Sequence, residues 1–437
     1  MRPGARIAAA IAVLEDIRAH HRPASIALAD WGRKHRFAGS GDRAAIGTHV
    51  YDALRRRASA GWVMGDDTPR ALMLGTLALA DDASEDAIAA LFDGSEHAPA
   101  ALADAERARL AMASQLADAP PHVQADVPEW LWPAFEDAFE DEAVAEGQAL
   151  AMRAPTDLRV NALKADTPRV IKSLGKVKMV PASIARLGLR LPAPAGSGRT
   201  PNVQNEAAFQ KGWFEVQDAG SQIVADLVFA KPGEQILDFC AGGGGKTLAL
   251  AAAMDNRGQI HAYDSDKSRL APIHQRLKRA GVRNAQVHTP TSEGPLSDLA
   301  GLVGRMDRVV IDAPCTGTGV WRRRPDAKWR VSPEALETRL AQQRAILDDA
   351  RNFVRPGGYL CYITCSVLPA ENEQQVHAFV NENPDFELVS AEEAWRELFG
   401  MNAPSPWSDD LVSLRLTPAA TQTDGFYFAV TERRHEE

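Results

Sequence analysis

The first third of the chain carries apolar residues at helical spacing. One apolar face runs along a helix expected over residues 5–21. A second helix is expected to start at Asp42, an N-cap residue type, and to end in the basic run Arg55–Arg57. Further helices are expected at 69–80, 83–92 and 99–115. Since no strand pattern precedes residue 155, this region is predicted to be an all-helical bundle.

From residue 215 onward, short apolar runs alternate with helical patterns. Strands are expected near 235–240, 259–263, 284–288, 307–312 and 358–364. Helices are expected near 217–229, 246–254, 267–279, 333–354 and 370–382. The alternation predicts a doubly wound, mostly parallel sheet, closed by an antiparallel strand at 425–430. Ligands of such sheets bind at the carboxyl ends of the strands.

A smaller α/β unit is expected between these two regions. Residues 157–164 have a strand pattern, 168–174 a helical one, and 192–200 the Gly, Ser and Pro content of a surface loop. The predicted domains are therefore a helical domain over 1–127, a small α/β unit with its linker over 128–214, and the doubly wound domain over 215–437.

Composition places the chain among cytoplasmic globular proteins. The apolar content is 45%, and no uncharged apolar run is long enough to cross a bilayer. Four cysteines in 437 residues do not form a disulfide framework, and without Cys-x-x-Cys pairs they do not indicate zinc. We therefore expect a monomer without a membrane or metal partner.

The net charge of −9 is unevenly distributed. Residues 1–57 contain 11 Lys and Arg against 5 Asp and Glu, whereas residues 58–150 contain 3 against 19. A basic N-terminus can present a positive surface, so the overall charge does not exclude RNA binding. The run Arg55–Arg57 has an alternative explanation, because cations are favourable at a helix C-terminus without any RNA.

The sequence QILDFCAGGGGKT, Gln235–Thr247, predicts a buried strand, a glycine loop and a helix. A phosphate-binding P-loop is excluded, because Cys240 stands where its first Gly is needed. A dinucleotide-binding G-x-G-x-x-G is excluded too, since Thr247 or Leu248 takes the place of the third Gly. The nucleoside loop of an S-adenosylmethionine methyltransferase remains. Asp264, about twenty residues further on, is placed to accept hydrogen bonds from a ribose.

Two cysteines follow neighbouring strands of the predicted sheet. Cys315 follows the fourth strand and Cys365 the fifth. Methyltransferases that act on exocyclic amines usually have Asn or Asp, Pro, Pro and an aromatic residue at the first position, but this chain has a thiol. Carbon 5 of a pyrimidine is a poor nucleophile until a thiolate adds to carbon 6, and a base must later remove the carbon 5 proton. Alternatively, both could be unreactive buried residues, as we expect for Cys361 in mid-strand.

Together these motifs resemble the RsmB/Sun (Nop/Nsun-type) RNA 5-methylcytosine methyltransferases. The resemblance covers about 155–437, and its motifs lie at 158–164, 214–221, 240–246, 264, 312–315, 323–329 and 364–366. It implies a Rossmann-like methyltransferase domain preceded by a small α/β RNA-binding subdomain. The helical N-terminus is similar in layout to the NusB-like RNA-binding domain of the RsmB branch.

The resemblance also implies roles for individual residues. Cys365 would be the nucleophile, Cys315 would assist product release, and Asp312 with Lys246 would hold and polarise the cytosine. S-adenosylmethionine would be bound by Asp264, Asp312 and the loop residues Cys240, Ala241, Gly242, Gly243, Gly244, Gly245 and Lys246.

The basic stretch 322–330 is the predicted RNA contact. It contains five basic residues and two neighbouring tryptophans, which suit an RNA backbone with a stacked base. The candidate residues are Arg322, Arg323, Arg324, Lys328 and Trp329. An ordinary basic loop is the alternative.

The expected product is 5-methylcytosine in RNA, with small-subunit ribosomal RNA as the expected substrate. Transfer RNA is the alternative substrate. The family loop usually reads Ala-Pro before its Gly-Gly-Lys, whereas Gly243-Gly244 stand here. A catalytically weak RNA-binding assembly factor with the same fold is therefore the third hypothesis.

Overall fold

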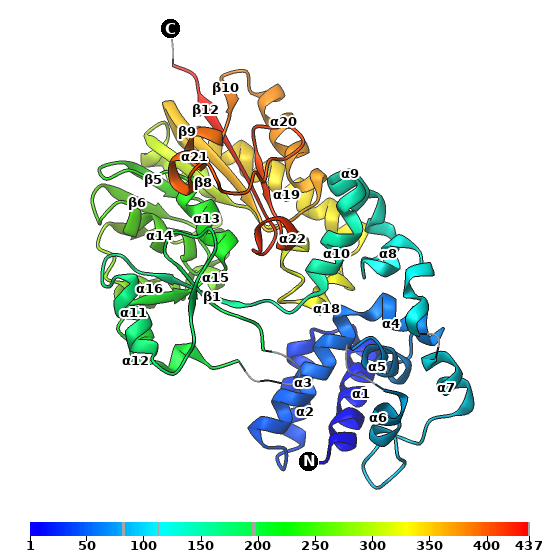
Figure 1. Ribbon diagram of the computed structural model, residues 1–437. Coiled ribbons are helices and arrows are strands. Elements are labelled where there is room, and N and C mark those ends of the chain that lie inside the picture. The colour runs from blue at the N-terminus through cyan, green and yellow to red at the C-terminus, as the bar shows by residue number, and fades with distance from the viewer. Residues whose placement is uncertain (81–83, 112, 195–197, 199, 436–437) are drawn as a thin grey trace. The chain divides into compact units, whose positions relative to one another are not determined.

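A computed structural model (Figure 1) describes residues 1–435 except 81–83, 112, 195–197 and 199. Parts of the predicted helices 83–92 and 99–115, and of the predicted loop 192–200, lie outside these described residues. Among the described residues, no helix is long and apolar enough to span a membrane.

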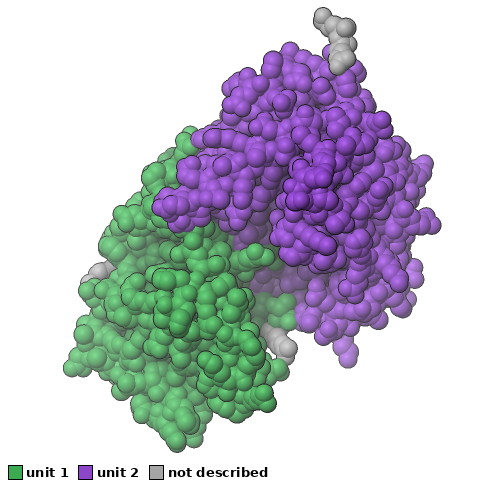
Figure 2. Space-filling view, turned by 180° about the vertical axis from the view of Figure 1, so that it is seen from behind, with its two compact units in different colours: residues 1–153, 194–200, 321–331 green, residues 154–193, 201–320, 332–437 purple. Residues whose placement is uncertain are grey.

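The chain forms two compact units, coloured separately in Figure 2. Unit 1 comprises Met1–Arg153 with two later segments, Pro194–Thr200 and Trp321–Val331. Unit 2 comprises Ala154–Ala193, Pro201–Val320 and Ser332–Glu437. The predicted boundary after residue 127 falls inside unit 1, and the one after residue 214 falls inside unit 2.

Unit 1 is helical, as predicted. Its α-helices are α1 (Pro3–His20), α2 (Ala24–Lys34), α3 (Ser40–Arg55), α4 (Arg57–Met64), α5 (Pro69–Ala78), α6 (Glu85–Leu91), α7 (Asp104–Leu110), α8 (Pro121–Gln124), α9 (Trp132–Phe139), α10 (Ala143–Ala151) and α18 (Pro325–Lys328). Short 3-10 helices are η1 (Ala113–Asp118), η2 (Glu129–Leu131) and η3 (Glu140–Glu142). The apolar face of α1 places Ile7, Ile11 and Leu14 in the core.

The predicted cap of α3 is wrong. The helix begins at Ser40 with Gly39 as its N-cap, so Asp42 lies in the first turn. The carboxylate of Asp42 instead forms ion pairs with the N-terminal ammonium at 3.1 Å and with Arg6 at 2.9 Å. The Asp42 carboxylate therefore forms tertiary ion pairs in place of the helix cap that its local sequence position had predicted.

Unit 2 contains a small and a large sheet. The four-stranded sheet has the order β2-β3-β1-β4, with β1 (Thr156–Val160), β2 (Val180–Pro181), β3 (Gly188–Leu191) and β4 (Phe214–Val216). The large sheet has the order β10-β12-β9-β8-β5-β6-β7, and β11 pairs with β12. Its strands are β5 (Gln235–Asp238), β6 (Gln259–Ala262), β7 (Ala285–Val287), β8 (Met306–Asp312), β9 (Val354–Thr364), β10 (Phe386–Val389), β11 (Leu414–Leu416) and β12 (Phe426–Arg433).

The predicted sheet topology is confirmed. Strands β5 to β9 run parallel, and β12 pairs antiparallel with β9, register Tyr427 to Thr364. Separate apolar clusters cover the two faces, one around Ile236 and Val310 and the other around Leu237 and Val309. Alternate residues of buried strands thus pack against helices on both sides, as a doubly wound sheet requires.

The helices of unit 2 are α11 (Thr167–Leu174), α12 (Ala207–Gln210), α13 (Ala219–Leu227), α14 (Gly245–Ala253), α15 (Lys267–Leu270), α16 (Ile273–Ala280), α17 (Pro295–Asp298), α19 (Pro333–Ala350), α20 (Glu373–Glu382), α21 (Glu392–Phe399) and α22 (Pro418–Thr421). Its 3-10 helices are η4 (Val203–Asn205), η5 (Ala300–Leu302), η6 (Thr318–Val320), η7 (Arg351–Phe353) and η8 (Pro369–Glu371). The predicted helix 267–279 is two helices, because Pro272 between them cannot donate a backbone hydrogen bond.

Candidate active site

The glycine loop lies between the end of β5 and the start of α14. Gly242 and Gly244 adopt φ angles of 48° and 81°, in the left-handed region that glycine tolerates. A Cβ atom on Gly244 would lie 2.6 Å from Cγ1 of Ile273, so the loop also needs glycine for its packing against α16. The absence of side chains on this loop leaves Gly243 and Gly245 as its partly exposed backbone positions, which a ligand could approach closely.

Asp264, at the end of β6, is attached to this loop. One carboxylate oxygen accepts the backbone N–H of Gly242 at 2.9 Å, and the other accepts that of Asp266 at 2.9 Å. The side chain is almost fully buried, and the Arg269 guanidinium is 3.8 Å away. The structure thus brings the predicted ribose contact against the predicted cofactor loop.

Asp238, the last residue of β5, was not among the predicted site residues. The hydroxyl of Thr247 donates to its Oδ2 at 2.6 Å, while Oδ1 has no hydrogen-bond partner among the described residues. Burial raises the pKa of Asp238 to about 7, and the nearby Asp312 adds to the increase. A buried carboxylate oxygen without a partner, at the strand end that leads into the glycine loop, fits a ligand that carries amine or hydroxyl donors. Its position directly before the loop was the available signal in the sequence.

The raised pKa of Asp238 predicts a pH-dependent stability. The folded state keeps its proton up to about pH 7, whereas the unfolded chain loses it near pH 4. The free energy of unfolding should therefore fall as pH rises from about 4 to 7, by at most about 1.4 kcal/mol per pH unit. Asp238→Asn should remove this slope, because an amide oxygen can still accept from Thr247. Urea unfolding of both proteins at pH 5 and pH 8 measures the effect, and parallel pH profiles would contradict it.

Lys246 and Asp312 form a close ion pair. Lys246 lies in the first turn of α14 and is buried, Asp312 ends β8, and Nζ is 2.6 Å from Oδ2. The Asp312 side chain is 37% exposed, so a ligand can reach it beside the buried ammonium. Strands β5 and β8 are neighbours in the sheet, which is why residues 66 positions apart in sequence meet here.

The two predicted cysteines also meet. Cys315 lies after β8 and Cys365 after β9, and their sulfur atoms are 3.4 Å apart. Both side chains are half-buried, so neither is sealed in the core. The hydrogen bond with Cys365 and burial raise the pKa of Cys315 well above its usual range. Cys361 is fully buried, which raises its pKa to about 12 and agrees with its predicted packing role.

A buried carboxylate holds the turn that carries Cys315. Glu371 accepts the Thr316 backbone N–H at 2.8 Å, the Thr316 hydroxyl at 2.5 Å and the Gln343 amide at 3.1 Å. The expected helix start at residue 370 concealed this role, since a glutamate in a first helical turn is ordinary. In the structure α20 begins at Glu373, and Glu371 ends η8.

The turn after Cys365 is held by hydroxyl and amide groups. Ser366 and Thr318 share a hydrogen bond of 2.9 Å, and Asn372 accepts the Thr364 hydroxyl at 2.6 Å. The backbone N–H of Gly319 donates to the Cys365 carbonyl at 3.0 Å. Both sulfur-bearing turns are thus fixed by buried polar contacts, which preorganises the pair.

The predicted RNA contact 322–330 belongs to unit 1, and much of it packs inside that unit. The ammonium of Lys328 donates to the carbonyls of Asp126 at 2.7 Å and Arg55 at 3.2 Å. The Trp329 indole donates to the Leu54 carbonyl at 2.6 Å. Arg322 is buried as well, whereas Arg323 and Arg324 are exposed. Packing within unit 1 thus uses the side chains of Lys328 and Trp329, and RNA contact by this stretch stays a prediction.

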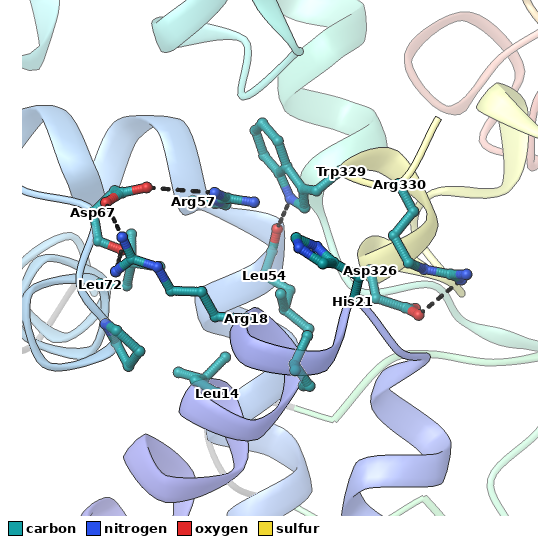
Figure 3. A pocket seen from close by; sticks show the side chains of 12 residues that line it. Leu14, Arg18, His21, Leu54, Arg57, Asp67, Leu72, Asp326, Trp329 and Arg330 are labelled. Atoms are coloured by element: carbon teal, nitrogen blue, oxygen red, sulfur yellow. Dashed lines mark hydrogen bonds and ion pairs between the residues drawn. The ribbon is translucent and has the colours of Figure 1, made fainter. Parts of the chain in front are cut away.

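Trp329 also lines a cavity of about 90 Å³ in unit 1 (Figure 3). Three arginines surround this cavity, and each is paired with a carboxylate. Arg18 and Arg57 pair with Asp67 at 3.1 and 3.4 Å, and Arg330 pairs with Asp326 at 3.1 Å. The carboxylates offset most of the positive charge that the sequence suggested there.

Lys328→Ala is expected to destabilise unit 1 by about 2–4 kcal/mol, because it removes a buried cation and leaves two carbonyls without a donor. Burial already lowers the pKa of Lys328 to about 8, which shows how far this ammonium is from water. Thermal unfolding measures the loss. Exposed Arg324→Ala is the control and should change stability by less than about 0.5 kcal/mol. Equal melting of the two variants would contradict the packing role.

Comparisons with known proteins come from both sequence and structure. A sequence profile described as 16S rRNA methyltransferase RsmB/F matches residues 226–432. A Synechocystis protein named probable ribosomal RNA small subunit methyltransferase B is 34% identical over 314 residues, which cover 70% of this chain and 66% of the relative. A Sodalis glossinidius protein named ribosomal RNA small subunit methyltransferase B is 34% identical over 336 residues, 76% of this chain and 68% of the relative. For the Synechocystis relative and two further relatives, the matched region covers only 65–66% of the relative's own length.

Solved structures share the fold. The crystal structure of PH0851 superposes with a TM-score of 0.73, at 25% identity, over 99% of both chains. NSun6 from Pyrococcus horikoshii, solved with SFG, superposes with a TM-score of 0.61 at 22% identity, over 71% of this chain and 99% of that one.

Proposed function

The chain belongs to the family of the 16S rRNA methyltransferases RsmB/F, and from this premise we propose that it methylates carbon 5 of a cytosine in small-subunit ribosomal RNA. The observation that carries the proposal is the pair of half-buried sulfur atoms 3.4 Å apart at the ends of neighbouring parallel strands. A single amine-methylating site has no use for two adjacent thiols, whereas activation of an inert ring carbon needs a nucleophile and a proton carrier.

The methyl donor would be S-adenosylmethionine. The glycine loop, Asp264 and the unpartnered oxygen of Asp238 would hold it through its hydroxyl and amine groups. When bound, it supplies a methyl group made electrophilic by its positively charged sulfur.

In the proposed reaction, the thiolate of Cys365 adds to carbon 6 of the cytosine. The new S–C6 bond moves the electron pair of the C5–C6 double bond onto carbon 5, which then takes the methyl group. A base then removes the carbon 5 proton, the electron pair of that C–H bond restores the C5–C6 double bond, and the S–C6 bond breaks to release the Cys365 thiolate. Cys315, whose sulfur lies 3.4 Å from that of Cys365, assists this release.

Asp312 and Lys246 would hold the base. The exposed edge of the Asp312 carboxylate can accept from the exocyclic amine, and the buried ammonium of Lys246 fixes that carboxylate at 2.6 Å. This arrangement discriminates cytosine from uracil, which offers a carbonyl oxygen at the same ring position and would face the carboxylate without a proton between them.

The test is methylation of purified ribosomal and transfer RNA by the purified protein, read by sequencing of 5-methylcytosine. We expect one or a few methylated cytosines in small-subunit RNA and none with Cys365→Ala. Methylation of transfer RNA alone would show that transfer RNA, and not small-subunit ribosomal RNA, is the substrate. Failure to bind S-adenosylmethionine in calorimetry would favour the assembly-factor hypothesis instead.

A further inference from the structure

Three aromatic rings in contact lie at the end of α2 and just after it, and we name them the ring ladder: Trp31 in the helix, and His35 and Phe37 in the residues that follow. The rings of Trp31 and His35 are stacked, with centroids 4.3 Å apart and planes inclined by 16°. His35 then meets Phe37 edge-on at 5.8 Å. Trp31 packs against the helical core of unit 1, while Phe37, at the other end, is 73% exposed.

The exposed position of Phe37 is fixed by the fold. Both the backbone N–H and Nδ1 of His35 contact the Trp31 carbonyl at 2.9 Å. The next residue, Ala38, is buried, and its carbonyl accepts the Arg43 guanidinium at 2.9 Å. The backbone is therefore held on both sides of Phe37, at a position where the ring is 73% exposed. An exposed aromatic ring next to other rings and to cations can serve as a stacking surface for a ligand.

Three exposed cations, Arg33, Lys34 and Arg36, are interleaved in sequence with the ladder residues, and we name them the basic rim. The nearby Asp30 is already shared between Arg22, at 2.6 Å, and Arg33. Among the residues that the structure describes, no acidic side chain pairs with Lys34 or Arg36. Lys34 and Arg36 therefore differ from Arg33 and from the arginines around the unit 1 cavity, whose charge is offset by carboxylates.

We propose that the ring ladder and its basic rim form a docking surface for single-stranded or loop RNA. A splayed-out base would stack on the free face of Phe37 and extend the ladder by one ring, while Lys34 and Arg36 would contact the flanking phosphates. An RNA duplex offers no free base face, so the surface selects unpaired RNA. The inference rests on the proposed function only in taking RNA as the ligand class.

The test is fluorescence anisotropy with a labelled single-stranded RNA of about ten nucleotides, followed across a salt series. Phe37→Ala should weaken binding by about 5- to 100-fold, which corresponds to one base stack, and Phe37→Trp should restore it. The double variant Lys34→Gln with Arg36→Gln should lower the slope of log affinity against log salt by up to about 1.4. Ile26→Ala, which truncates an exposed apolar residue on the same helix, is the matched control and should bind as the unmodified protein does.

Wild-type affinity in Phe37→Ala would overturn this inference, and so would equal binding of a duplex of the same length, because charge alone would then account for the affinity. The proposed function fails separately. If the unmodified protein binds RNA through this surface but methylates none, the docking surface stands and the enzymatic proposal falls. If the protein methylates RNA and the Phe37 and rim variants bind RNA normally, the enzymatic proposal stands and the docking surface falls.

Discussion

Cys365→Ala is expected to lower methyl transfer by at least ~10³-fold and to leave no covalent protein–RNA complex. The reason is that Cys365 is the proposed nucleophile and the raised pKa of Cys315 makes that neighbouring thiol a poorer one. The Cys365 sulfur is half-buried, 3.4 Å from its neighbour, and its turn is held by Ser366 and Thr318. Denaturing electrophoresis after incubation with RNA and S-adenosylmethionine measures the complex directly.

Cys315→Ala should give the opposite result in the same denaturing electrophoresis, namely a covalent protein–RNA complex. Addition to carbon 6 still proceeds, but release of the methylated base is impaired, so a complex that resists denaturation should accumulate. Cys361→Ala is the matched control. It removes a buried thiol from β9, the strand that Cys365 follows, and the variant should behave as the unmodified protein does. A stable complex with Cys365→Ala and none with Cys315→Ala would reverse the two roles.

The second large effect is expected at the Lys246–Asp312 pair. Lys246→Met should lower activity by about 10²- to 10³-fold, because Asp312 loses the ammonium that fixes the orientation of its carboxylate. Asp312→Asn should cause a loss of similar size, because the carboxylate that accepts the cytosine amine is gone.

A double-mutant cycle separates joint action from independent action. If the two residues act as one unit, the double variant should be no worse than the more severe single variant. Full additivity, with a loss of about 10⁴-fold or more, would show that each residue acts alone. Calorimetry with S-adenosylmethionine controls for damage to the neighbouring glycine loop.

The sequence alone determined the doubly wound sheet and the positions of the site residues along it. This was possible because parallel strands end at one edge of the sheet. Residues that follow β5, β6, β8 and β9 must then lie close together, whatever the details of packing. Gly242 with Asp264, Lys246 with Asp312, and Cys315 with Cys365 meet for that reason.

Contacts between distant segments were decided only by the tertiary structure. Glu371 reaches Thr316 across 55 positions, and no local pattern marks that partnership. Two local predictions failed as well. The helix predicted over 267–279 is interrupted at Pro272, and Asp42, predicted as the N-cap of a helix, lies in the first turn of α3.

The two basic, aromatic-containing segments of unit 1 make the distinction clearest. Residues 31–37 and 321–330 both combine Lys and Arg with aromatic side chains, and only the second segment was predicted to contact RNA. Folding buries Lys328 against carbonyls more than 200 positions away and leaves Phe37 in solvent. Composition sets what a segment can bind, but exposure depends on which distant backbone groups pack against it, and only the folded chain contains that information.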